Sequence, residues 1–218
     1  MRDLRNGPPR DHLRVLSTHG FGRKIVAPLL SDFHARYPAI ALELVLSDRP
    51  ADFRQDHIDL WFCEGSVQEA GIVARRLMPR QLVVCASHGY ARTYGLPQSV
   101  DDLADHRCIN LRTGCGSIQA WTFKVDGLAQ RRQFVAQHTF NDASLIVQAV
   151  MDGLGIAQLP TYQVCGLLAE GKLLRCLAQY APDDSGHYLC YPNRKSVPAR
   201  IRVFVEYMTA RLHTLAVE

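Results

Sequence analysis

Residues 13–22 are Leu13-Arg14-Val15-Leu16-Ser17-Thr18-His19-Gly20-Phe21-Gly22. The first five alternate apolar and polar side chains, which is typical of a half-buried β-strand, and the next five form a turn of small residues. A helix is predicted over residues 22–37, because its apolar residues recur at helical spacing and Pro38 ends the run. This stretch therefore predicts a strand, a turn and a helix in that order.

Two further strands are predicted at residues 40–46 and 58–62, with a short helix between them at residues 51–55. An alternation of strands and helices indicates a parallel sheet covered by helices, since parallel strands need crossover connections. The first part of the chain is therefore predicted to be an open α/β lobe.

A second lobe is predicted from about residue 87, where the elements become shorter. The dipeptide Asp126-Gly127 is a hairpin signal between two apolar segments. The predicted elements are a strand at 82–86, a helix from Ser99 to His106, strands at 108–111, 121–125 and 133–136, a helix capped by Asn141 and Asp142, a strand at 156–159, a helix at 162–169, strands at 173–177 and 188–191, and a helix at 198–212.

The composition is that of a globular protein, with 218 residues of which 47% are hydrophobic and 21% are charged. We expect a cytoplasmic protein that does not contact membranes, because the sequence shows neither a long apolar span nor a signal segment. The net charge is +4, and the basic residues are interleaved with acidic ones along the sequence. The basic excess near the start, at Arg2, Arg5, Arg10 and Arg14, is interpreted as a solvated linker, with direct DNA contact as the alternative.

The seven cysteines are scattered, without a Cys-x-x-Cys pair or a histidine spacing typical of zinc. We expect reduced thiols, no metal and no cofactor. A redox pair of Cys108 and Cys115 is the alternative, but most free cysteines are small buried apolar groups.

The sequence has no Gly-x-Ser-x-Gly elbow, His-Glu-x-x-His pair, phosphate-binding loop or dinucleotide fingerprint. Gly153-Leu154-Gly155 precedes a predicted strand, so it is interpreted as a helix stop. His19, the histidine in the first turn, is a candidate catalytic base, but no nucleophile is predicted beside it. The sequence therefore predicts no catalytic residue and no enzyme.

The first turn has the character of a binding site. Ser17 and Thr18 end a strand where a helix begins, and free N–H groups and the helix dipole attract anions there. Asn141 begins another helix that can offer similar donors, so a carboxylate is a suitable ligand. The alternative is that Ser17, Thr18 and Asn141 only cap their helices.

The order of segments resembles the effector-binding domain of LysR-type bacterial transcription regulators over roughly residues 10–213. The matching segments are Leu13-Arg14-Val15, residues 27–38, Leu42-Glu43-Leu44 with Ser47-Asp48, Asp59-Leu60 with Gly65, residues 74–77, residues 84–87 with Tyr90, Asn141-Asp142, residues 153–160, Tyr191-Pro192 and residues 198–204.

The resemblance implies an α/β fold of two Rossmann-like lobes joined by two crossover strands, as in type 2 periplasmic binding proteins. It divides the chain into a linker remnant (1–11), lobe I (12–85 and 191–218) and lobe II (86–190). It implies a small-molecule effector, commonly a carboxylate or aromatic acid, bound in the interlobe cleft. The implied effector contacts are Ser17, Thr18, Phe21, Cys63, Ser87, Arg112, Thr113, Asn141, Gly155 and Pro160.

The family further implies a homodimer, a tetramer in the full-length form, and DNA contact only through a winged helix-turn-helix that precedes the equivalent of residue 10. One local departure concerns the segment Asp59-Leu60-Trp61-Phe62-Cys63-Glu64-Gly65. Family members often read Asp-Leu-Ala-Ile-Arg-x-Gly there, so Cys63 replaces a cation. A free-standing solute-binding protein of the same fold is the alternative function.

Overall fold

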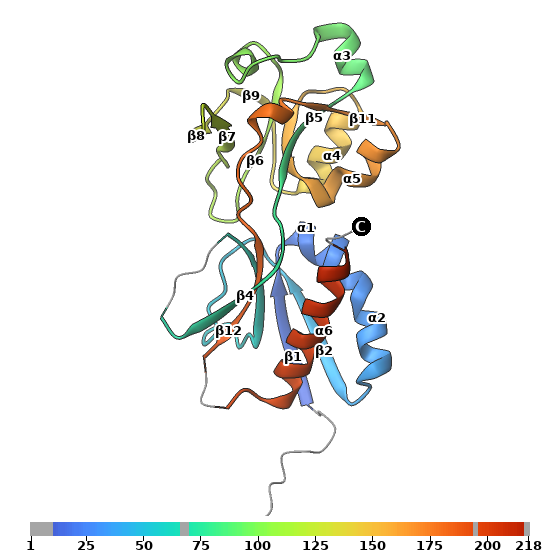
Figure 1. The fold of residues 1–218 in the computed structure, drawn as a ribbon, viewed down its shortest axis with the longest axis vertical. Helices are drawn as coiled ribbons and strands as arrows, with labels where there is room; N and C mark the ends of the chain where they lie inside the picture. The colour runs from blue at the N-terminus through green and yellow to red at the C-terminus, as the bar shows by residue number, and fades with distance from the viewer. Residues whose placement is uncertain (1–10, 66–69, 194–195, 216–218) are drawn as a thin grey trace, which may run out of the picture. The chain divides into compact units, whose positions relative to one another are not determined.

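A computed structural model describes residues 11–65, 70–193 and 196–215 of the chain (Figure 1). The described residues form two compact units: unit 1 comprises residues up to Pro79 and from Gly186 onward, and unit 2 comprises Arg80–Ser185. The predicted linker remnant lies outside the described residues except for Asp11, which begins the first strand.

The two unit boundaries fall earlier in the chain than the predicted lobe boundaries after residues 85 and 190. Strand pairing explains the difference. Strand β5 (Leu82–Ser87) pairs only within the sheet of unit 2, and β12 (His187–Pro192) pairs only within the sheet of unit 1. Each strand therefore belongs to its unit from its first residue.

Unit 1 contains a five-stranded sheet of order β2-β1-β3-β12-β4. Strand β1 (Asp11–Ser17) is parallel to β2 (Ile40–Leu46) and β3 (Leu60–Glu64), as the sequence predicts. The complete sheet is mixed, because β12 runs antiparallel to both of its neighbours, β3 and β4 (Ile72–Met78). Strand β4 was not predicted, since residues 74–76, which include two arginines, are exposed and interrupt the apolar pattern.

The helix predicted at residues 51–55 is wrong. These residues form turns, because the Asp52 carboxylate accepts hydrogen bonds from the backbone amides of Arg54 and Gln55, both at 2.9 Å. An aspartate that binds its own downstream amides favours a turn over a helix.

The helix predicted after the first strand begins three residues early and has three parts: α1 (His19–Phe21), a π-helical segment η1 (Gly22–Val26) and α2 (Ala27–Arg36). Helix α2 packs against the last helix, α6 (Ala199–Leu215), as Figure 1 shows. The ring of Phe33 lies 5.0 Å from that of Phe204, and Tyr207 donates a hydrogen bond to the Leu29 carbonyl at 3.1 Å. This packing holds the helical run against the last helix within unit 1.

Unit 2 is built around β5, which is antiparallel to both β10 (Ala157–Pro160) and β11 (Leu173–Cys176). Alternate residues of β5 enter different cores. Val83 and Cys85 pack with α4 (Ala143–Met151) and α5 (Thr161–Ala169), whereas Val84 and Ala86 join the cluster that includes Trp121 and Phe123.

The remaining elements of unit 2 lie between β5 and α4, with one short helix after β11. They are α3 (His88–Tyr94), η2 (Asp101–Ala104), the parallel pair β6 (Cys108–Leu111) and β9 (Ala136–Phe140), the hairpin of β7 (Trp121–Val125) and β8 (Leu128–Arg132), and η3 (Ala178–Tyr180).

The hairpin turn is at Asp126-Gly127, as predicted, and both residues have positive φ, 51° and 78°. The return strand was predicted at residues 133–136 but starts at Leu128, because a two-residue turn leads directly into the paired strand.

Candidate functional site

The turn after β1 holds two hydroxyl groups that have no hydrogen-bond partner within the described part of the chain. Ser17 is 0% exposed and its Oγ is buried, as is Oγ1 of Thr18. Thr18 is the residue before α1, with φ −62° and ψ 154°, yet its side chain does not cap the helix. The structure therefore excludes the interpretation that these two hydroxyls serve as helix caps.

Gly22 allows the helical run to lie close against the end of β1. A Cβ atom at this position would lie 2.3 Å from Cδ2 of Leu46 and 3.3 Å from Oγ of Ser17. The Gly22 amide donates a hydrogen bond to the Thr18 carbonyl at 2.9 Å. Any side chain here would fill the space beside the Ser17 hydroxyl.

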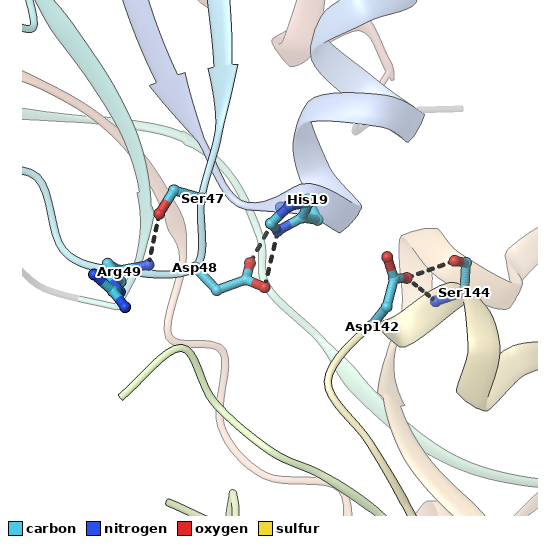
Figure 2. A network of polar contacts seen from close by, with 6 residues as sticks. All are labelled: His19, Ser47, Asp48, Arg49, Asp142 and Ser144. Atoms are coloured by element: carbon cyan, nitrogen blue, oxygen red, sulfur yellow. Dashed lines mark hydrogen bonds and ion pairs between the residues drawn. The ribbon is translucent and has the colours of Figure 1, made fainter. Parts of the chain in front are cut away.

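The Asp48 carboxylate accepts a hydrogen bond from the first backbone amide of the helical run. Its Oδ1 accepts a hydrogen bond from the His19 backbone amide at 3.1 Å, and its Oδ2 lies 3.0 Å from the ring Nδ1 of His19 (Figure 2). A carboxylate from the chain itself thus uses part of the anion-attracting helix start. Sequence reasoning assigned no role to Asp48.

Phe21 and Cys63 are interior residues of unit 1. The ring of Phe21 stacks on that of His187 with centroids 4.4 Å apart, and it lies 5.7 Å from that of Phe62. Cys63 lies on β3 with its Sγ 3.2 Å from Sγ of Cys190 on β12. The partner thiol was missed because it lies 127 residues away in the sequence.

Three of the predicted contacts in unit 2 hold local structure through hydrogen bonds. Ser87 caps α3, because its Oγ accepts from the Tyr90 amide at 3.2 Å. Arg112 Nη1 donates to the Gly116 carbonyl at 2.8 Å, and Thr113 Oγ1 donates to the Ser117 carbonyl at 3.1 Å. Arg112 and Thr113 therefore brace one turn.

The start of α4 differs from the prediction by one residue. Asp142 is the capping residue, and its carboxylate accepts from both the amide, at 2.8 Å, and the hydroxyl of Ser144 (Figure 2). Asn141 precedes the cap and is exposed. Its position leaves the capping role to the aspartate, whose carboxylate binds a helix start well.

The last two predicted contacts are Gly155, two residues before β10, and Pro160, the last residue of that strand. A Cβ atom on Gly155 would lie 2.2 Å from the Arg107 carbonyl oxygen, so the lack of a side chain is a packing requirement. Pro160 ends β10 and precedes α5.

Within the described residues, no group of three potential metal ligands occurs, and no helix is long and apolar enough to cross a membrane.

The family described as the LysR substrate binding domain matches residues 6–213. The chain belongs to this family. Its predicted fold is confirmed by solved LysR regulators. The LysR-type regulator CrgA of Neisseria meningitidis is 29% identical, has a TM-score of 0.84, and is matched over 94% of this chain and 69% of that one. The CrgA regulatory domain alone is matched over its full length, 100%, with a TM-score of 0.81.

Relatives of this LysR domain are named as transcription regulators. One is the probable regulator LtrA of Klebsiella pneumoniae, 31% identical over 89% of this chain, and another is CrgA of Neisseria meningitidis serogroup C, 31% identical over 94%. The chain spans 63% of the length of the former and 68% of the latter. A more distant structure, the AphB regulatory domain of Vibrio vulnificus, is 21% identical with a TM-score of 0.80 and shows the fold alone.

Proposed function

We propose that this LysR domain senses a small carboxylate-bearing molecule, and that Ser17 and Thr18 bind it. The observation that carries the proposal is the pair of buried hydroxyls without partners in the described structure. A buried polar group left unsatisfied costs about 1–3 kcal/mol, so a fold that keeps two adjacent ones is explained when a ligand binds them.

The chemistry of the turn favours an oxygen-rich acceptor. Both hydroxyls can donate, and they lie at the start of the helical run from His19 to Arg36, where the helix dipole favours negative charge. Because Asp48 already binds the His19 amide, we infer that the ligand carboxylate binds the hydroxyls rather than that amide.

Effector contact by the remaining predicted residues rests on the family resemblance. We propose it for Arg112, Thr113 and Asn141, of which Arg112 is the cation that a carboxylate would attract. Ser87, Gly155 and Pro160 have structural roles, so we propose that any contact they make uses their backbone. Cys63 replaces the common family arginine with a thiol that contacts Cys190, so we propose that it gives the ligand no charge.

We further propose that the domain forms homodimers, and tetramers in a full-length regulator that binds DNA through a separate N-terminal domain in the cytoplasm. The names of LtrA and CrgA, HTH-type transcription regulators that are longer than this chain, support the DNA-binding part of this proposal.

A thermal-shift screen of aliphatic and aromatic carboxylates, each paired with its neutral amide, tests the ligand class. A ligand at 100 times its dissociation constant adds about 2.7 kcal/mol to the free energy of unfolding. We expect shifts from acids and not from their amides. No shift from a broad panel would contradict the proposal.

The double variant Ser17→Ala/Thr18→Val tests the residues, with Ser99→Ala in unit 2 as a control. We expect the double variant to bind any acid found in the screen at least tenfold more weakly, because two donors are lost. Unchanged affinity in the double variant would place the site elsewhere.

A further inference from the structure

Two buried thiols lie against each other in the sheet of unit 1. Cys63 on β3 is 3% exposed and Cys190 on β12 is 0% exposed, and their Sγ atoms are 3.2 Å apart. In the antiparallel register, Cys63 is opposite Tyr188 and Cys190 is opposite Trp61. Opposite residues share a face of the sheet, as do residues two apart, so the cysteines are diagonal neighbours on one face.

The two sulfur atoms are close, but they are farther apart than in a disulfide bond. A disulfide needs the sulfurs at about 2.05 Å, so they must approach each other by about 1.2 Å from 3.2 Å. Diagonal neighbours have Cα atoms about 7–8 Å apart, beyond the roughly 4.4–6.8 Å usual for a disulfide, so the backbone must also move. Such a bond would pull the strands together under strain, and strained disulfides are the ones that reduce readily.

Strand β12 is irregular near this position. Its pairing with β4 on the other side shifts register between His187 and Tyr188. A register shift interrupts the ladder of hydrogen bonds, so the strand is held less uniformly two residues before Cys190.

The two thiols differ in chemical character. The hydrogen bond from the Cys63 thiol lowers the pKa of Cys190, because it stabilises the thiolate form. The same hydrogen bond, together with burial, raises the pKa of Cys63 above its usual value. Burial raises the pKa of Cys108 to about 12, and burial together with the neighbouring Cys176 raises the pKa of Cys85 to about 12. Cys190 is therefore the nucleophile of the pair, and Cys63 is the thiol that resolves the intermediate.

We propose that Cys63 and Cys190 form a reversible disulfide when the protein meets a hydroperoxide. The Cys190 thiolate attacks one peroxide oxygen, the O–O bond breaks, and the leaving oxygen takes a proton to become an alcohol or water. The resulting Cys190 sulfenic acid is attacked by the Cys63 sulfur, which forms the S–S bond and releases water. The two thiols lose two protons and two electrons, and the peroxide gains both.

This pair differs from the one considered on the sequence. The Cys108 thiol donates to the Leu103 carbonyl at 3.4 Å inside unit 2, whereas Cys115 is exposed and contacts Thr113 and Ser117. The two environments are separate, so Cys108 and Cys115 are not arranged as a disulfide pair.

The experiment uses the full chain with both exposed thiols removed, as Cys115→Ser/Cys165→Ser, so that reaction at the surface does not obscure the result. The protein is treated with hydrogen peroxide, a probe small enough for a buried site, then unfolded and alkylated with N-ethylmaleimide. Intact mass counts the remaining free thiols, and peptide mapping without reductant identifies any cross-link. We expect the loss of two thiols per chain, a peptide that joins Cys63 to Cys190, and recovery with dithiothreitol.

Single variants in the same background separate the two roles, with circular dichroism to verify the fold. With Cys63→Ser, which keeps a hydroxyl donor beside Cys190 but cannot form a disulfide, we expect Cys190 to stop at the sulfenic acid, which dimedone traps. With Cys190→Ala, we expect Cys63 to remain a free thiol. Cys176→Ala is the matched control and should still lose two thiols.

Two results would overturn the proposal. One is that every thiol of the background protein remains open to alkylation after peroxide, and the other is that the mapped cross-link joins a different pair. The mapping needs no buried substitution, so it decides the question even if an alanine variant does not fold.

Discussion

The carboxylate of Asp59 lies 3.3 Å, through Oδ1, from Nη2 of Arg200 on α6. Its other oxygen accepts a hydrogen bond from the backbone amide of Arg14 at 3.1 Å, and the Asp59 amide donates to the Arg14 carbonyl at 2.9 Å. One side chain thus joins β1, the start of β3 and the last helix within unit 1. Asp59 was noted in the sequence for its family resemblance, and the structure supplies the physical reason for an aspartate there.

Asp59→Ala is expected to lower the free energy of unfolding by about 2 kcal/mol, because hydrogen bonds to a partly buried charged group are worth about 1.5–3 kcal/mol. The side chains of Asp59 and Arg200 are only 17% and 23% exposed. Urea unfolding followed by circular dichroism measures the change. Asp32→Ala is the control. Its ion pair with Arg211 is shorter, 2.7 Å, but the side chains are 64% and 50% exposed. We expect a loss below about 1 kcal/mol there, and equal losses in the two variants would contradict the prediction.

Ser17→Ala is expected to stabilise the ligand-free protein by about 1 kcal/mol, because it removes a buried hydroxyl that lacks a partner in the described structure. Ser87→Ala is the matched comparison, since that hydroxyl is also buried but caps α3. Loss of such a cap costs about 1 kcal/mol. Denaturant unfolding of the two variants should therefore give shifts of opposite sign. Destabilisation by Ser17→Ala would mean that the hydroxyl has a partner in the free protein, and this would weaken the argument for a ligand.

Gly155→Ala is expected to destabilise the protein by about 2 kcal/mol, because its Cβ would lie 2.2 Å from the Arg107 carbonyl oxygen. The backbone at Gly155 cannot move away from Arg107 easily, since the next amide, that of Ile156, donates a hydrogen bond to the same carbonyl at 2.8 Å. Thermal and urea unfolding measure the loss.

Gly166→Ala provides the contrast on a neighbouring helix. Nothing lies within 4 Å of the position of its Cβ, and the residue is inside α5. We expect a gain of about 0.5–1 kcal/mol, since alanine is the better helix former. If both variants behaved alike, close contact with Arg107 would not be the reason for the glycine.

Local patterns were sufficient to predict much of the fold. The alternation in residues 13–17, the periodic helix after it and the Asp126-Gly127 turn all depend on neighbours in sequence, and each appears where it was expected or within a few residues. The errors arise where a different interaction dominates. At residues 51–55, the Asp52 carboxylate binds backbone amides and forms a turn, and in β4 three consecutive exposed residues interrupt the apolar alternation.

The candidate site was harder to predict because its decisive features depend on distant residues. The place of Ser17 and Thr18 at a strand end follows from the sequence, but the lack of a partner for their hydroxyls does not. The use of the first helix amide by Asp48 and the contact of Cys63 with Cys190 depend on strand pairing over long separations. No pattern within a single segment carries that information.

Cys115 is expected to react with alkylating agents at neutral pH. Hydrogen bonds from the side chains of Ser117 and Thr113 lower the pKa of this exposed thiol from 9.0 to about 7. The thiolate is the reactive form, so the rate of alkylation by iodoacetamide should rise with pH, with a midpoint at about 7, and become constant above it. The Cys165→Ser background isolates this signal, because Cys165 is the other exposed thiol among the described residues.

Ser117→Ala removes the largest contribution to that lowered pKa, so the midpoint should move upward toward 9.0. Ser144→Ala is the control, because its hydroxyl binds Asp142 and not the thiol, and it should leave the midpoint unchanged. The hydrogen bonds favour the folded thiolate, so their contribution to stability is present above the unfolded pKa of 9.0 and is lost as the pH falls through about 7. A midpoint that is the same with and without Ser117 would show that the hydroxyl does not stabilise the thiolate.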